Sequence, residues 1–232
     1  ALHVAALLAH QVAGWWGMQH THYAAPAIPP LAATTLGAIL LAGAAFGLVA
    51  RVFAAGSHAL GRFMKQRLAW PPLRPLVGGA CLAAILWWPV AAPYRGLGTP
   101  VIAQSLLEPL PWHTPLAKLL LTIASLGAGF KGGEVTPLFF IGSTLGNVLA
   151  PLLQQPFAFL AALGFAAVFA AAAKTPLAGT LLAMELFGSA IGPYALLACV
   201  MAYIFSGAQG IYRAQLTAPG SPCGPQPSPE PQ

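Results

Sequence analysis

Long apolar runs joined by short connections constrain this chain more than any other feature of its sequence. Hydrophobic residues make up 58% of its 232 residues, and charged residues make up only 6%. A soluble globular domain carries roughly 25% charged residues. Four acidic and ten basic side chains cannot keep so much apolar surface in water. We therefore expect a multi-pass integral membrane protein.

The apolar runs predict helices, because a helix satisfies its own backbone hydrogen bonds in lipid. The runs cover residues 2–18, 31–56, 72–92, 116–128, 137–153, 157–173, 176–187 and 190–206. A straight crossing needs about 20 residues, and most of these runs are shorter and end at Gly or Pro. The expected fold class is all-α, with short, broken and tilted transmembrane helices. Helices that stop inside the bilayer are typical of transport sites.

Thr-Pro pairs punctuate the second half of the chain, at residues 99–100, 114–115, 136–137 and 175–176. Each pair predicts a helix start, with Thr as the N-cap and Pro at the first helical position. The Pro- and Gly-rich stretch 94–115 predicts a loop that carries a short helix.

The domain organisation follows from composition. Residues 1–216 are expected to form one transmembrane domain, and the Pro-rich residues 217–232 to form a disordered cytoplasmic tail. The sequence begins Ala-Leu-His-Val-Ala without an initiator Met. We therefore expect a fragment that lacks its N-terminal portion.

The basic residues gather around one connection: Arg51, Arg62, Lys65, Arg67 and Arg74. This pattern is typical of cytoplasmic loops. We expect the protein to lie in a plasma or inner membrane. We favour a cytoplasmic loop over a nucleic-acid or lipid-headgroup patch and expect no nucleic-acid partner. The three cysteines have no metal-ligand spacing. We expect no metal and no cofactor.

The segment from Gly127 to Gly142 carries the candidate site. Glycines at 127, 129, 132 and 133 break one helix, and Thr136-Pro137 starts the next. A helix N-terminus offers free amide donors and a positive dipole end, which attract an anion. Glycine lets the backbone approach a ligand closely.

Glu134 is the unusual residue of this segment. A carboxylate at mid-membrane depth costs about 2.5–3.5 kcal/mol on insertion scales, and burial favours its neutral form. A protonated Glu134 would donate a hydrogen bond to an anion, whereas an ionised one would repel it. Glu134 could thus couple proton uptake to anion binding. A structural pair between Lys131 and Glu134 is the alternative, and Thr136 has an alternative role as a helix cap.

The sequence Gly-Gly-Glu-Val-Thr-Pro, followed by Leu-Phe-Phe-Ile-Gly, resembles the Gly-Gly-x-Phe-x-Pro filter segment of the CLC chloride channels and transporters. Ala173-Lys-Thr-Pro-Leu-Ala-Gly179, with Met184-Glu185, resembles the CLC segment that begins their penultimate membrane helix. Gly210-Ile-Tyr212 is similar to the CLC stretch that holds the inner-gate tyrosine. The resemblance covers about residues 1–216 and implies the C-terminal half of a CLC subunit, one half of an inverted repeat.

Most CLC proteins have an apolar residue followed by Phe where this chain has Glu134 followed by Val135. Glu-Val-Thr-Pro at this point resembles the fluoride/proton antiporter branch. The resemblance implies that Gly133, Glu134, Val135 and Thr136 contact the anion, and that Glu134 takes part in proton coupling. It places Gly132 in the filter loop, Pro137 at the helix start, and the Tyr212 hydroxyl on the intracellular side of the anion site. The gating glutamate and the N-terminal anion loop of this family lie in the first half of the subunit, outside this sequence.

The expected function is halide transport, as proton-coupled fluoride export through a CLC-type pathway. The alternative is a CLC chloride channel or a chloride/proton antiporter. An intramembrane enzyme is a distant alternative, because Ser125, Ser143 and Ser206 lie near no obvious base, and we expect no catalytic residue. Glu185 could act as a proton relay, but the resemblance favours a structural role at a helix end. The expected partners are the halide, protons, membrane lipid and a second copy of the chain. The resemblance implies a homodimer whose interface includes Leu181, Leu182, Leu196 and Leu197.

Overall fold

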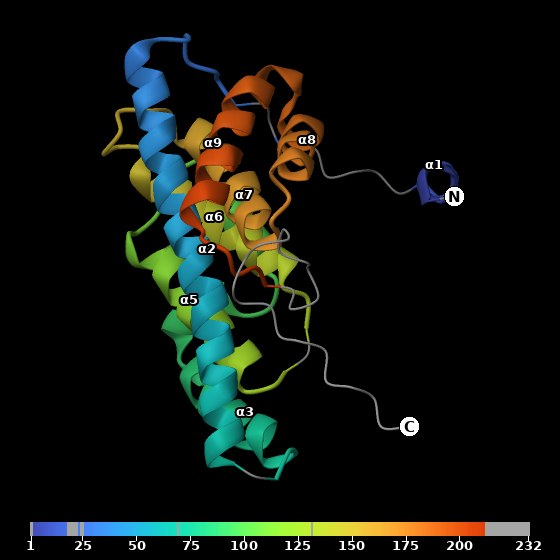
Figure 1. Cartoon of the computed structure of the whole chain (residues 1–232), viewed down its shortest axis with the longest axis vertical. Coiled ribbons are helices and arrows are strands. Elements are labelled where there is room, and N and C mark those ends of the chain that lie inside the picture. Colours follow the sequence, from blue (N-terminus) through green and yellow to red (C-terminus); the bar gives the residue numbers. More distant parts are fainter. Residues whose placement is uncertain (1, 18–22, 24–25, 69, 131, 212–232) are drawn as a thin grey trace.

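The computed structural model describes residues 2–17, 23, 26–68, 70–130 and 132–211, which form helices and contain no strand (Figure 1). The helices are α1 (Leu2–Trp15), α2 (Ala33–Arg67), α3 (Leu73–Trp87), α4 (Thr99–Ser105), α5 (His113–Gly127), α6 (Val135–Leu149), α7 (Phe157–Ala173), α8 (Pro176–Phe187) and α9 (Gly192–Phe205), with 3₁₀ turns η1 (Pro89–Tyr94) and η2 (Ser189–Ile191). The all-α prediction is confirmed. The predicted tail lies outside the described residues.

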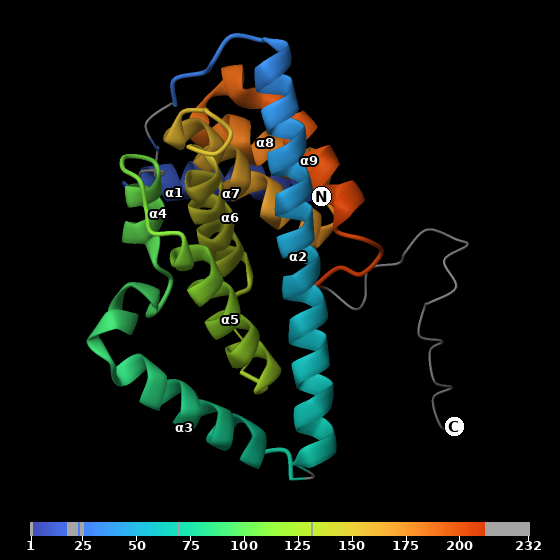
Figure 2. The ribbon, with the colours of Figure 1, turned by 90° about the vertical axis from the view of Figure 1, so that its left-hand side faces the viewer.

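Helix α2 runs along nearly the whole length of the molecule (Figure 2). Its apolar run predicted an end at residue 56, but the helix continues to Arg67. The prediction was wrong because the following residues, although more polar, contain no proline and keep Leu60, Phe63 and Met64. Lys65 and Arg67 in the last turn also favour the negative end of the helix dipole. Among the described helices, α2 alone is both long and apolar enough to cross a membrane.

Helix α7 forms the centre of the core, and α6, α2, α8 and α9 pack around it. It is almost entirely buried and consists mostly of Ala and Phe. A Cβ on Gly142 of α6 would collide with the carbonyl of Gly164 in α7, and one on Gly146 would collide with the carbonyl of Leu160. Small residues of this kind let membrane helices approach closely. The contact fixes α6, which carries the candidate site at its N-terminus.

The Thr-Pro pairs lie at helix starts, but the predicted capping was wrong at three of the four. Only Thr175 occupies the N-cap position, and its side chain makes no capping hydrogen bond. Helices α4, α5 and α6 begin at Thr99, His113 and Val135, so the threonines lie inside the first turn. Proline is tolerated there because the first amides of a helix have no intrahelical partner.

The predicted loop 94–115 does carry a short helix, α4, and a buried side chain of α6 holds the end of that helix. Asn147 Nδ2 donates to the carbonyls of Ser105 and Glu108, at 2.6 and 2.8 Å, and Asn147 Oδ1 accepts from the amide of Leu110 at 2.8 Å. The side chain of Asn147 is almost fully buried. One amide group therefore ties three backbone positions of the loop to α6.

Candidate functional site

The glycine segment breaks the chain between α5 and α6 as predicted. Helix α5 ends at Gly127, and Gly129 adopts a φ of +98° that only glycine takes readily. The chain then reaches Glu134, which occupies the N-cap position of α6. Two helix ends thus meet at this loop, and the carboxylate lies where they meet.

The first turn of α6 offers free backbone donors. Val135 and Thr136 are the first residues of the helix, so their amides lack an intrahelical acceptor, and Pro137 has no amide hydrogen. The amide of Leu138 donates to the Glu134 carbonyl at 3.3 Å. The amides of Val135 and Thr136 and the positive end of the helix dipole can therefore attract an anion.

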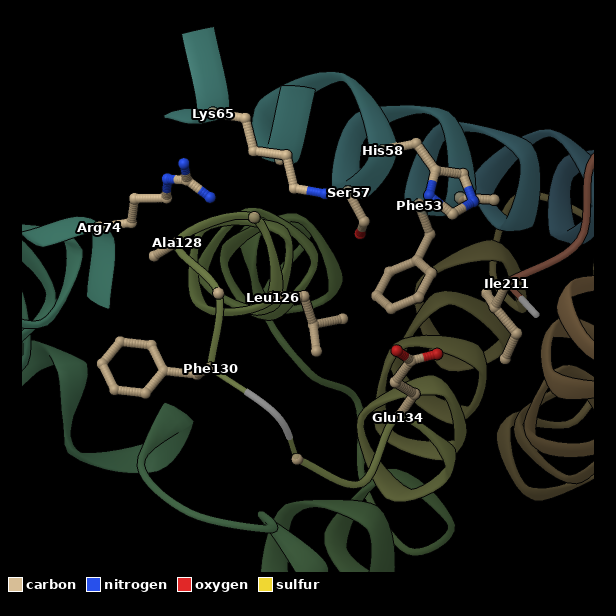
Figure 3. Close-up of a pocket in the computed structure, with 15 residues that line it drawn as sticks. Phe53, Ser57, His58, Lys65, Arg74, Leu126, Ala128, Phe130, Glu134 and Ile211 are labelled. Atoms are coloured by element: carbon tan, nitrogen blue, oxygen red, sulfur yellow. The ribbon is translucent and has the colours of Figure 1, made fainter. Parts of the chain in front are cut away.

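The Glu134 side chain does not cap its own helix. Its carboxylate points into a cavity, toward Phe53 and the wall formed by α2 (Figure 3). The Oε2 atom is buried, and it makes no hydrogen bond within the described part of the chain. A buried carboxylate oxygen needs a proton, a water molecule or an ion as its partner. Glu134 is therefore placed to exchange one of these with the cavity.

The cavity has a volume of about 480 Å³ and lies between α2, the start of α3, the end of α5 and the glycine loop. Lys65 and Arg74 line one end of it, and Ile211 lies at the other (Figure 3). His58 lines the wall opposite Glu134. Among the described residues that line the cavity, Glu134 is the acidic one. Its basic end will attract anions toward the loop.

A second cavity of about 200 Å³ borders the same loop and includes Gly132, Gly133, Pro137 and Lys118 of α5. Gly132 lines both cavities. Lys118 is 4% exposed, and its Nζ donates to the carbonyls of Tyr94 and Gly96 at 3.0 and 2.7 Å. It also lies 5.1 Å from the centre of the Phe140 ring. No carboxylate among the described residues pairs with it, so its positive charge is compensated by carbonyl dipoles.

The structure brings most of the predicted site residues to this one loop. Gly132, Gly133, Glu134 and Pro137 line the two cavities, and Val135 and Thr136 are half-buried in the first turn of α6. These are their positions; their roles in anion binding stay predictions.

Two other predicted residues, Tyr212 and Lys131, lie outside the described residues. The pairing of Lys131 with Glu134 therefore stays a prediction. Ile211, which precedes Tyr212, lines the larger cavity, and its amide donates to the Ala172 carbonyl at 3.0 Å. Glu185 is exposed on α8 and lines neither cavity.

Two residues of the site were not predicted from the sequence, His58 and Lys118. Phe53, Ala54, Ser57, His58, Gly61 and Lys65 recur at helical spacing and share one face of α2, a pattern visible in the sequence once the helix is extended past residue 56. Lys118 lies within the apolar run 116–128, where an ionisable residue is by itself a functional signal.

A family model described as "Voltage gated chloride channel" matches residues 1–207. A chloride/fluoride channel protein of Pseudomonas syringae pv. tomato is 49% identical over 219 residues, which are 91% of this chain and 48% of the relative. A voltage-gated ClC-type chloride channel of Citrobacter koseri is 30% identical over 163 residues, 62% of this chain and 37% of that protein. The chain thus spans about half or less of the length of these relatives.

Solved structures give the same result for the fold. The crystal structure of a CLC-type fluoride/proton antiporter superposes with a TM-score of 0.83 at 36% identity, covering 87% of this chain and 51% of that one. A slow cyanobacterial Cl⁻/H⁺ antiporter superposes with a TM-score of 0.70 at 21% identity, covering 84% and 49%. The second likeness concerns the fold alone.

Proposed function

This chain belongs to the voltage-gated chloride channel family, and from that premise we propose that its protein carries halide ions across a membrane, exporting fluoride in exchange for protons. The family consists of integral membrane proteins, in agreement with the composition. The observation that carries the proposal is the half-buried Glu134 at the start of α6, whose buried Oε2 atom has no partner among the described residues and lies in a cavity with a basic end.

Fluoride is small and strongly hydrated, so a site that removes its water must supply hard hydrogen-bond donors. The free amides of Val135 and Thr136 and the Thr136 hydroxyl can supply such donors. A protonated Glu134 adds an O–H donor, which is lost when the carboxylate ionises. Anion binding and proton binding at this position therefore favour each other, so the two equilibria are coupled at this residue.

The names of the relatives support both fluoride and chloride as transported ions. We favour fluoride because this chain has Glu134-Val135-Thr136 in the filter segment, and the fluoride/proton antiporter superposes with the higher TM-score. Chloride transport, as a channel or a chloride/proton antiporter, is the second candidate. Efflux of fluoride and of chloride from matched liposomes separates them, and a strong preference for chloride would favour the second.

The coupling role is tested by Glu134→Gln in the full-length protein reconstituted in liposomes. We expect the variant to stop fluoride flux or to uncouple it from protons, because the amide cannot carry a titrating proton. Glu185→Gln is the matched control, since that glutamate is exposed on α8. Proton-coupled fluoride exchange at the wild-type rate in Glu134→Gln would refute the proposal.

A transporter role also agrees with the hydrogen bonds of Ser125, Ser143 and Ser206, the candidate nucleophiles of an intramembrane enzyme. The hydroxyls of Ser125, Ser143 and Ser206 each donate to a carbonyl one turn back in their own helix. Among the described residues no basic side chain bonds the hydroxyl of Ser125 or Ser143, whereas Ser206 Oγ also accepts a hydrogen bond from Lys174 Nζ at 2.6 Å. We propose that the protein acts as a transporter and not as an enzyme.

We further propose that the protein is a homodimer of a plasma or inner membrane, with α8 and α9 at its interface. Leu181 and Leu196 are exposed on these helices, whereas Leu182 and Leu197 pack against the core. The interface would therefore use the first pair. Cysteine at position 181 should cross-link two copies in the membrane, and failure of cross-linking at both 181 and 196 would argue against this face.

A further inference from the structure

We propose that His58 passes protons between Glu134 and the solvent at the basic end of the cavity. The inference rests on the proposed function and adds a residue from α2 to it. His58 would not hold the halide. Its part is to take the proton that Glu134 gives up and to return it to water.

The two side chains share the cavity but come from opposite walls. His58 projects from α2, and the Glu134 carboxylate points toward that helix from the start of α6 (Figure 3). A positive charge on His58 would interact favourably with an ionised Glu134. The Ser57 hydroxyl and Glu134 Oε2 are both buried and unpartnered within the described residues that line the cavity. Polar atoms of this kind favour water in a cavity of about 480 Å³.

A hydrogen bond sets which nitrogen of His58 can receive a proton. The Nε2 atom lies 3.3 Å from the carbonyl oxygen of Gly210. A carbonyl only accepts, so Nε2 carries the hydrogen and the neutral ring keeps its lone pair on Nδ1. Protonation at Nδ1 leaves the bond to Gly210 in place and makes it charge-assisted, hence stronger. His58 can thus gain and lose a proton without releasing its anchor.

The transfer balances at each step. The carboxyl O–H of Glu134 breaks, its proton moves through water to the Nδ1 lone pair, and the products are a carboxylate and an imidazolium. The Nδ1–H bond then breaks toward water at the basic end, and the neutral ring is restored. No oxidant, metal or further reactant is needed.

The charged groups that line the cavity with His58 come from several elements. Lys65, from the same helix, and Arg74, from α3, are the basic ones among the described lining residues, and Glu134 is the acidic one. The residues that α5 and the segment after α9 contribute, Leu126 and Ile211 among them, carry no charge. Of the charged groups, an ionised Glu134 interacts favourably with a positive charge on His58, which ties the charge of one group to that of the other.

The bond from His58 to Gly210 ties α2 to the segment after α9, which is a structural role. The experiment must distinguish this structural role from proton transfer. His58→Gln keeps an N–H donor but cannot take up a proton. The matched control is His113→Gln, an exposed histidine at the start of α5. Should His58→Gln fail to fold, as judged by size-exclusion elution, His58→Asn is measured in its place.

The experiment measures proton and fluoride flux of the full-length protein in liposomes from pH 5 to 8, the range in which histidine changes charge. We expect His58→Gln to slow proton flux about tenfold and to flatten its pH profile, while His113→Gln matches the wild type. An unchanged rate and profile in His58→Gln would overturn the inference. Equal loss of both fluxes at every pH, with the profile kept, would show a structural role and overturn it too. Absence of proton-coupled fluoride flux in the wild type would instead overturn the proposed function.

Discussion

Gly142 of α6 and Gly164 of α7 stand backbone against backbone, so that a methyl group on either would collide with the carbonyl of the other. This contact holds α6 against the most buried helix of the protein. Since Glu134 is the N-cap residue of α6, the position of the carboxylate depends on how closely these two helices pack.

Gly142→Ala should destabilise the protein by about 1–3 kcal/mol, because an added methyl group overpacks a tight core. The measurement is the thermal unfolding midpoint of the protein in detergent. Gly37→Ala in α2 is the control, since nothing lies within 4 Å of the added Cβ, and it should leave the midpoint unchanged or raise it slightly. Equal midpoints for Gly142→Ala and the wild type would contradict the packing argument.

Asn147→Ala should also lower the unfolding midpoint, because it removes three hydrogen bonds, one to the buried carbonyl of Ser105 and two to part-buried backbone groups of the loop after α4. Each group left unpaired costs about 1–3 kcal/mol. Gln104→Ala is the comparison, since the Gln104 side chain is exposed and donates to the side chain of the exposed Glu108. Similar midpoints for the two variants would show that the Asn147 bonds do not hold the loop.

Lys118→Met should weaken fluoride binding, because it removes a buried positive charge that lines the cavity beside Gly133. A loss of about 1 kcal/mol raises the half-saturating fluoride concentration roughly fivefold. Lys118→Arg keeps the charge and should stay closer to the wild type. Concentration-dependent fluoride flux measures both variants, and equal half-saturation for Met and wild type would exclude an electrostatic role.

Lys65→Glu should slow halide flux at low ionic strength, because Lys65 lines the basic end of the cavity and raises the local anion concentration. The difference from the wild type should shrink as salt rises, since the screening length falls to about 3 Å at 1 M. Arg67→Glu reverses a charge on the same helix outside the cavity and should have a smaller effect. A defect of Lys65→Glu that does not change with salt would indicate a structural cause.

Local features of the sequence predicted most of the helices and the break that carries Glu134. The apolar runs 157–173 and 176–187 predicted both ends of α7 and α8 correctly. Helical periodicity and the Gly or Pro at a helix end are local signals, which depend on only a few neighbouring residues. The glycines before Glu134 and the Thr-Pro after it predicted a helix start there for the same reason. The end of α2 was missed because polar and basic residues interrupt the apolar run after residue 56, although Leu60, Phe63 and Met64 keep a helical spacing there.

The sequence by itself determined a helical membrane protein with a carboxylate at a helix start, because composition and local backbone preference decide those properties. Only the tertiary structure decided that His58 and Glu134 line one cavity, that Lys118 borders the same loop from the second cavity, and that the Ser57 hydroxyl has no partner among the described residues. These residues come from α2 and α5, and their positions depend on how glycine and alanine faces of distant helices pack. No pattern within one helix contains that information.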